Sequence, residues 1–289
     1  MNTCALEAPS VKPSITLDHL SFSSIKTYQA CPRKFAYKYL EKVPEEFTPS
    51  YFAFGGAFHK AVERVHEAMI VGEPLPDLGE LLDAFDRAWL DLTAERPQIK
   101  FAKDEDAGSL RELASRMLSA FREHTLSAPS AGSKIIAIEE SVRFRLLADV
   151  PPIEMRLDLL ELSGTDLIVS DLKTSKSRWN AIKIADGLPQ LILYAHGLLP
   201  LLRELGATRI VPRFVAVTKA KKPVVQVLQP VATQDDVVRL KQTVAETWGA
   251  IQNGVFHRRE SWACSQCPFR RHCLGRRLTL QKRRKGVAI

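Results

Sequence analysis

The residues with the clearest chemical potential are Asp158 and the triplet Asp171 to Lys173, on two neighbouring β segments. Side chains alternate across a strand, so Asp171 and Lys173 point to the same face. If the segments pair in register as a hairpin, Asp158 approaches Asp171, and two nearby carboxylates can hold Mg²⁺ or Mn²⁺. A lysine beside them could orient or deprotonate an attacking water, while the cation neutralises charge growing on a phosphate. Taken alone, a D-x-K triplet is common and mostly belongs to exposed strands.

Further polar side chains of interest lie on two predicted helices. Gln190 and Tyr194 are four residues apart, so they share one face of the helix that follows the D-x-K strand. A tyrosine in an apolar helix is usually a core residue, which is the alternative interpretation. His59 lies on an earlier predicted helix, where a single histidine is more often structural or exposed than a ligand.

Four cysteines form a pattern that is typical of a metal site. Cys264, Cys267 and Cys273 read C-x2-C-x5-C, and Cys31 lies far away near the start of the chain. Three thiols cannot complete a four-coordinate site for a soft metal, so Cys31 is the candidate fourth ligand. Such a site would join the two ends of the chain. Cys4 lies in a leader with Pro and Ser and is interpreted as a spare thiol.

The spacing alone leaves the metal open between an iron–sulfur cluster and zinc. A C-x2-C pair also occurs in zinc knuckles, although zinc ribbons usually carry two of them. Disulfides would need an oxidising compartment, and residues 1–14 show no secretory signal, so we expect a cytoplasmic protein. Residues 255–263 are polar with few apolar side chains, so we expect the two chain ends to dock mainly through the metal.

The net charge of +8 is concentrated in the last part of the sequence. Residues 270–285 contain no acid, and their eight basic residues account for the whole excess of 41 basic over 33 acidic residues. They are Arg270, Arg271, Arg276, Arg277, Lys282, Arg283, Arg284 and Lys285. Such a segment suits phosphate backbones or anionic membranes. The alternative is a solvated tail that only aids solubility. No apolar run reaches the length of a membrane span.

The predicted elements form a helical first half, a mixed β and α second half and a cysteine-rich end. We expect helices from Ser21 or Ser23 to Cys31, from Pro32 onward, and over 54–71, 78–95, 106–126 and 189–205, with a last helix from the capping pair Thr233 and Asp236 to Gly254. We expect strands within 135–146 and over 153–162, 166–174, 209–218 and 223–229, with a hairpin at Ser163-Gly164.

These residues resemble RecB-type exonucleases of the PD-(D/E)XK superfamily, in the subgroup with an iron–sulfur cluster that includes AddB-type and CRISPR-associated nucleases. The resemblance covers roughly residues 20–275. Its motifs are Leu20 to Phe35 with Tyr37 and Tyr39, Gly55 to His59, Asp158, Asp171 to Thr174, Gln190 to Tyr194, and the four cysteines, in the family's order.

The resemblance implies an α/β fold with a restriction-endonuclease-like core, in which helices flank a mixed central sheet. A helical N-terminal part precedes that core, and an iron–sulfur staple joins the termini. The expected organisation is a disordered leader (1–14), one nuclease domain (15–275) and a basic tail (276–289). Within the domain, we expect a helical part (15–130), a nuclease core (131–254) and a cysteine segment (255–275).

The resemblance also implies the residue roles. His59, Asp158, Asp171 and the Leu172 carbonyl would bind Mg²⁺ or Mn²⁺. Lys173 would activate water, and Gln190 and Tyr194 would position DNA or the lysine. The four cysteines would hold a 4Fe–4S cluster, with Zn²⁺ as the alternative. The family often has glycine three residues before the first aspartate, whereas this chain has Met155, which could crowd the strand approach.

The expected function is a metal-dependent deoxyribonuclease, most simply an exonuclease on single-stranded DNA or DNA ends. Its setting would be DNA repair or recombination, phage DNA metabolism or CRISPR adaptation. No G-x4-G-K-S/T phosphate loop occurs, so unwinding would require a helicase or another recombination or CRISPR protein as partner. The alternatives are a structure-specific endonuclease and a non-catalytic DNA-binding or scaffolding protein. No membrane partner is expected.

Overall fold

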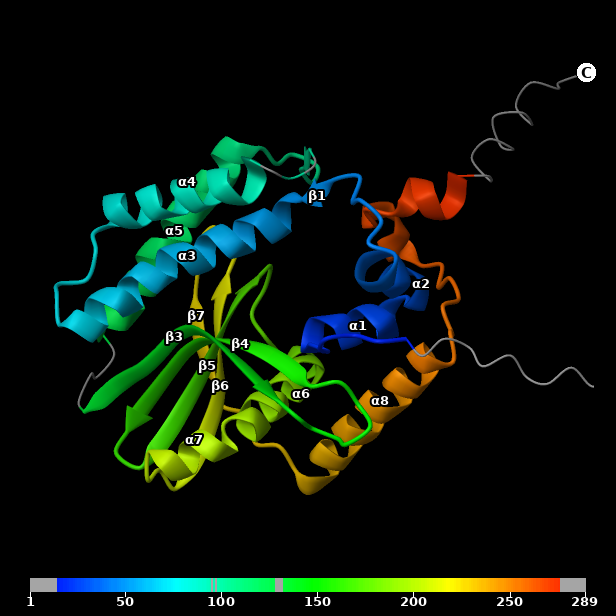
Figure 1. The fold of residues 1–289 in the computed structure, drawn as a ribbon. Helices are drawn as coiled ribbons and strands as arrows, with labels where there is room; N and C mark the ends of the chain where they lie inside the picture. The colour runs from blue at the N-terminus through cyan, green and yellow to red at the C-terminus, as the bar shows by residue number, and fades with distance from the viewer. Residues whose placement is uncertain (1–14, 95, 97, 128–131, 276–289) are drawn as a thin grey trace, which may run out of the picture.

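A computed structural model describes residues 15–94, 96, 98–127 and 132–275 (Figure 1). The leader and the basic tail after Gly275 lie outside these residues. The helices are α1 (Phe22–Ala30), α2 (Pro32–Phe35), the π-helical η1 (Ala36–Leu40), α3 (Ser50–Val71), α4 (Leu78–Ala94), α5 (Ala107–Ser127), α6 (Ala181–Gly197), α7 (Leu199–Glu204), α8 (Gln234–Gln252) and the 3-10 helix η2 (Trp262–Gln266). The strands are β1 (Thr48–Pro49), β2 (Ile99–Lys100), β3 (Ser133–Phe144), β4 (Ile153–Ser163), β5 (Asp166–Ser175), β6 (Arg209–Thr218) and β7 (Val225–Leu228).

A mixed five-stranded sheet in the order β3-β4-β5-β6-β7 forms the centre of the fold. All neighbours are antiparallel except β5 and β6, which are parallel because α6 and α7 connect them. The β4–β5 hairpin confirms the predicted pairing and runs from Ser163–Asp166 to Leu159–Ser170. The chain therefore has the predicted α/β architecture, in which helices flank a mixed sheet.

Helices cover the two faces of the sheet as separate groups (Figure 1). On one side α3 and α5 lie on the sheet and α4 packs on both, around a core that includes Phe58, Met117 and Leu172. On the other side α6 and α7 pack on the sheet around Leu157 and Phe214. In consequence α3 and α6 approach the same central strands from opposite sides.

The segment after α8 docks on the first helices through ordinary packing. The Tyr28 hydroxyl donates to the Val255 carbonyl at 2.7 Å, and Phe256 contacts the Tyr28 ring edge to face. Phe269 is fully buried and its ring lies 5.8 Å from that of Tyr37. The expectation that a metal would be the main means of docking was therefore wrong, because two phenylalanines in this segment supply an apolar contact.

Several predicted boundaries shift. The helix predicted to start at Phe54 begins at Ser50, directly after Pro49. The predicted helix 189–205 is two helices: α6 begins at Ala181 with Asn180 as its N-cap, so Pro189 lies inside it. The capping box of Thr233 and Asp236 on α8 is confirmed.

No helix in the described ranges is long and apolar enough to cross a membrane.

Candidate active site

Three ligand-type side chains converge where α3 crosses the sheet. His59 comes from α3, Asp158 from β4 and Glu139 from β3, and one ligand atom of each lies within 4.8 Å of the others. His59 Nδ1 is 3.3 Å from Asp158 Oδ1 and 3.8 Å from Glu139 Oε1. All three are partly buried, so water screens their charges less than on an open surface.

Glu139 is the residue that the sequence prediction missed. Its backbone has φ of 52°, a left-handed conformation that is uncommon outside glycine and costs about 1–3 kcal/mol. The β3–β4 register pairs Ile138 with Leu159 and Glu140 with Leu157, and omits the intervening Glu139 and Asp158. Glu139 lies within the predicted β segment 135–146, but nothing in its sequence context assigns it a role at the site.

Where β4 and β5 diverge, the Asp158 side chain accepts a hydrogen bond from the backbone of β5. The backbone pairing of the hairpin stops at Leu159–Ser170, and beyond it Asp158 Oδ2 accepts the N–H of Leu172 at 2.6 Å. This contact holds Asp158 beside Asp171, the neighbour of Leu172 in the chain. Leu172 itself is buried in the core under α3.

Asp171 is the most buried charged group of the site, with 2% of its side chain exposed. Gln190 Nε2 donates to Asp171 Oδ1 at 2.8 Å, and the Tyr194 hydroxyl lies 2.9 Å from the same oxygen. That hydroxyl is also 3.0 Å from the Arg156 carbonyl, and its single proton can serve only one acceptor at a time. Gln190 and Tyr194 therefore contact the aspartate directly, and their role in positioning DNA or the lysine stays a prediction.

Lys173 lies at the open side of the site with 32% of its side chain exposed. Its Nζ is 2.6 Å from Asp171 Oδ2, an ion pair at short range. The same oxygen makes no hydrogen bond of acceptable geometry, although it is buried. A buried carboxylate oxygen without a hydrogen bond is a suitable ligand for a cation.

Burial and neighbouring charges shift the pKa values of these groups in different directions. Burial disfavours the charged imidazole, but the hydrogen bonds and negative charges of Asp158 and Glu139 outweigh it and raise the pKa of His59 to about 9. Burial would raise the pKa of Asp158, yet His59 and the Leu172 N–H keep it below its usual value. Burial, together with the charge of Asp158, raises the pKa of Asp171 despite the attraction of Lys173. Such divergence is typical of functional sites.

The donor set fits Mg²⁺ or Mn²⁺. Carboxylate oxygens from Glu139, Asp158 and Asp171 are hard ligands that both ions prefer, and the imidazole of His59 is compatible with Mn²⁺. A cation among them would replace the proton that the carboxylates now stabilise on His59.

Met155 does not enter the site. It is buried in the cluster that contains Leu157 and Tyr194. A Cβ added to Gly197 on α6 would lie 2.4 Å from the Met155 terminal carbon, so the absence of a side chain at 197 provides the space. The methionine is thus accommodated in the layer under α6.

The four predicted cluster cysteines gather at the docked chain ends, each partly exposed. Burial raises the pKa of the Cys267 and Cys273 thiols, and the nearby Cys31 and Cys264 add to this rise. Of the eight predicted DNA-binding residues, Arg270 and Arg271 are exposed, and Arg276, Arg277, Lys282, Arg283, Arg284 and Lys285 lie outside the described residues.

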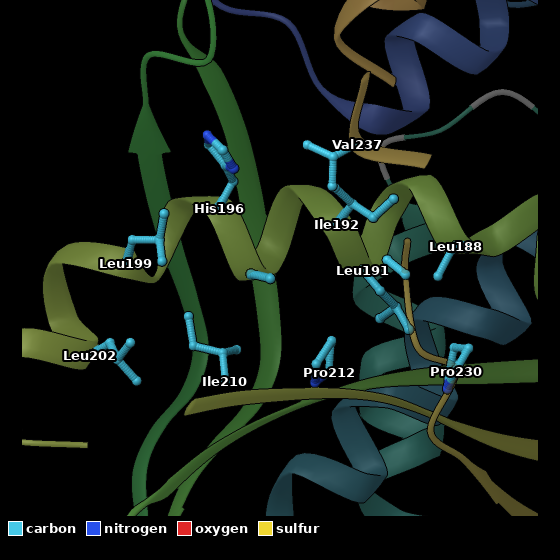
Figure 2. A pocket seen from close by; sticks show the side chains of 12 residues that line it. Leu188, Leu191, Ile192, His196, Leu199, Leu202, Ile210, Pro212, Pro230 and Val237 are labelled. Carbon is cyan, nitrogen blue, oxygen red and sulfur yellow. The ribbon is translucent and has the colours of Figure 1, made fainter. Parts of the chain in front are cut away.

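A separate cavity of about 240 Å³ lies between α6, α7 and β6 (Figure 2). Leucine, isoleucine and proline side chains dominate its lining, and His196 is the only residue in it with a titratable side chain. Because it contains no carboxylate or lysine, this cavity is not the catalytic site.

Comparisons with known proteins identify the family and the fold. The family model of the PD-(D/E)XK nuclease superfamily matches residues 19–274. The crystal structure of a candidate exonuclease from Eubacterium rectale covers 88% of each chain with a TM-score of 0.52 and 12% sequence identity, a similarity of fold. The structure of SSO0001 covers 86% of this chain and 92% of its own at 14% identity, but with a TM-score of only 0.28. No curated protein has a significantly similar sequence. The match over nearly the whole described chain shows that this protein belongs to the PD-(D/E)XK nuclease superfamily.

Proposed function

We propose that the protein is a Mg²⁺- or Mn²⁺-dependent deoxyribonuclease that acts as an exonuclease on single-stranded DNA or DNA ends. The observation that supports this most strongly is the convergence of His59, Glu139 and Asp158 beside the Asp171–Lys173 pair. Phosphodiester hydrolysis needs carboxylates that can hold a cation and a group that positions the attacking water, and residues suited to both tasks lie within one site.

Each residue has a defined task in this proposal. His59, Glu139, Asp158 and Asp171 hold the divalent ion, which when bound lowers the pKa of water and stabilises charge on the phosphate. Lys173, held by its ion pair with Asp171, orients the attacking water through its Nζ. Gln190 and Tyr194 fix one oxygen of Asp171, so its other oxygen stays directed at Lys173 and the ion.

We also propose that Cys31, Cys264, Cys267 and Cys273 hold a 4Fe–4S cluster. The resemblance to the iron–sulfur subgroup of the family carries this choice of cluster. The effect of Cys31 and Cys264 on the pKa of the Cys267 and Cys273 thiols supports the proximity of the four side chains. Zn²⁺ held by the same four thiolates is the alternative. Reduced thiols of this kind persist in the cytoplasm, where we propose that the protein acts.

The exonuclease assignment rests on the family motifs, and the solved neighbour named as a candidate exonuclease has a similar fold. We propose a role in DNA repair or recombination, phage DNA metabolism or CRISPR adaptation, with a helicase or another protein of those systems supplying any unwinding. The sequence contains no G-x4-G-K-S/T phosphate loop.

Purified protein should be incubated with Mn²⁺ and end-labelled single-stranded oligonucleotides, with circular single-stranded DNA in parallel. An exonuclease degrades only the linear substrate, and Lys173→Ala should reduce that activity by at least about 100-fold. Cleavage of the circle would instead identify an endonuclease. DNA binding without cleavage by the wild type would favour a scaffolding role.

A further inference from the structure

The sequence has a second basic region that its overall charge balance conceals. Residues 172–185 and 216–233 contain no aspartate or glutamate. Beyond Lys173 these two stretches contribute Lys176, Arg178, Lys183, Lys219, Lys221 and Lys222, here called the β5–β6 basic surface. Net charge alone points only to the C-terminal tail, because acids elsewhere in the chain balance these six residues.

The parallel pairing of β5 and β6 brings the two stretches to one edge of the sheet. Ser175 pairs with Thr218 at the ends of the strands, and the Lys219 N–H donates to the Ser175 carbonyl at 2.7 Å. Lys173 of the active site lies on β5 two residues before Ser175. The basic surface therefore lies next to the candidate active site, at the end of β5.

Among the residues that the structure describes, these cations form no close ion pairs. Within the described ranges, none of the six lies within 4.0 Å of a carboxylate. At the opposite end of the same two strands, Asp166 of β5 pairs with Arg209 of β6 at 2.6 Å. One end of the strand pair is thus neutralised internally, whereas the end beside the active site keeps its charge.

Two of the lysines are fixed in place by uncharged groups. Lys183 Nζ lies 3.1 Å from Ser175 Oγ and 2.9 Å from Ser177 Oγ, so hydroxyl groups orient it without cancelling its charge. Lys219 is half-buried, with its ammonium 4.1 Å from the centre of the Phe54 ring. Collecting like charges without counter-ions destabilises a fold, which a polyanionic ligand would offset.

We infer that the β5–β6 basic surface binds the sugar–phosphate backbone of the DNA strand next to the phosphate being cleaved, independently of the C-terminal tail. This inference rests on the proposed function. Lysine and arginine contacts to phosphates are independent of base sequence, so the surface fixes the strand in the site without selecting a sequence.

The test uses Lys173→Ala protein, so that the DNA remains intact, and a fluorescent oligo(dT) probe. One variant changes the exposed Lys176, Arg178, Lys221 and Lys222 to glutamine, which keeps most of each aliphatic stem. A second changes only Lys221 and Lys222. The control removes the same charge at four exposed positions on other elements: Arg87, Arg116, Lys134 and Arg203.

Binding is measured between about 50 and 200 mM salt, where log K falls with a slope of about 0.7 per phosphate contact on single strands. The four-site variant should lower that slope by up to about 2.8 and the two-site variant by up to about 1.4, while the control stays within about 0.7 of the parent. Equal slopes for variant and control would overturn the inference alone. A parent that binds no DNA would overturn both the inference and the proposed function.

Discussion

The carboxylate of Asp158 accepts the backbone N–H of Leu172 at 2.6 Å, so a side chain of β4 satisfies a main-chain group of β5. The same carboxylate lies 3.3 Å from His59 through its other oxygen. Asp158 therefore has a structural and a chemical task, and two substitutions separate them.

Asp158→Asn keeps an oxygen that can accept the Leu172 N–H but removes the negative charge, whereas Asp158→Ala removes both. We expect both variants to lose cleavage. Only the alanine variant should also lose about 1–3 kcal/mol of unfolding free energy, because it leaves a buried N–H unpaired. Urea denaturation together with a Mn²⁺-dependent cleavage assay measures the two effects. Full cleavage by Asp158→Asn would exclude the charge from catalysis.

Glu139 is a further metal-binding candidate whose contribution is directly measurable. Glu139→Gln keeps the shape of the side chain and removes its charge, so Mn²⁺ affinity measured by calorimetry should fall by about 10-fold or more. Glu140→Gln is the matched control, since Glu140 is adjacent in sequence and exposed. Equal Mn²⁺ affinities for the two variants would show that Glu139 only balances the charge of His59 and Arg156.

His66 should make the protein less stable in mild acid. It is buried beside Phe121, and burial lowers its pKa to about 4 despite the attraction of Asp158 and Glu139. Between pH 6.5 and 4 the unfolded chain therefore binds a proton that the folded chain does not, so the unfolding free energy falls as the pH falls. From pH 7.5 to 5 this group should cost about 2 kcal/mol. Urea denaturation of His66→Gln at both pH values should show a pH dependence smaller by that amount.

Lys219 should make DNA binding sensitive to alkaline pH. Burial lowers its pKa to about 8, with Lys176 lowering it and Glu105 opposing. Its charge is present below that pH and lost above it, so the affinity for single-stranded DNA should weaken between pH 7 and 9. Lys219→Arg stays charged over this range and should bind with little change. Parallel pH profiles for both proteins would refute the involvement of Lys219.

The proposed cluster site predicts the colour and the iron content of the purified protein. Anaerobically purified protein should be brown with about four irons per chain, and Cys31→Ser should lose the cluster. Because Phe256 and Phe269 also dock this segment, the variant should keep its fold while the unfolding free energy falls. Cys4→Ser is the control. Colourless wild-type protein with one zinc per chain would replace the cluster by a zinc site.

Local patterns predicted most of the fold. Apolar alternation identified the strands, and the Ser163-Gly164 turn fixed the hairpin that brings Asp158 to Asp171. Glu139 was not predicted because its role depends on a backbone conformation with positive φ, which the pattern of side chains does not reveal. Pro189 was interpreted as a helix start by its usual preference, whereas Asn180 caps α6 two turns earlier. The β5–β6 basic surface escaped because net charge does not record which residues become neighbours.

Met155 and Gly197 have a consequence for how sequences of this fold can vary. The Met155 terminal carbon and the Phe144 ring both occupy the volume that a side chain at 197 would need. The flexible methionine can move aside more easily than the ring, so a larger residue at 197 requires above all that the residue at 144 become smaller or shift. We expect position 197 to covary with positions 144 and 155 among related chains, such that glycine at 197 accompanies large side chains at the other two. Gly197 thus lets α6 lie close to two large side chains of the sheet.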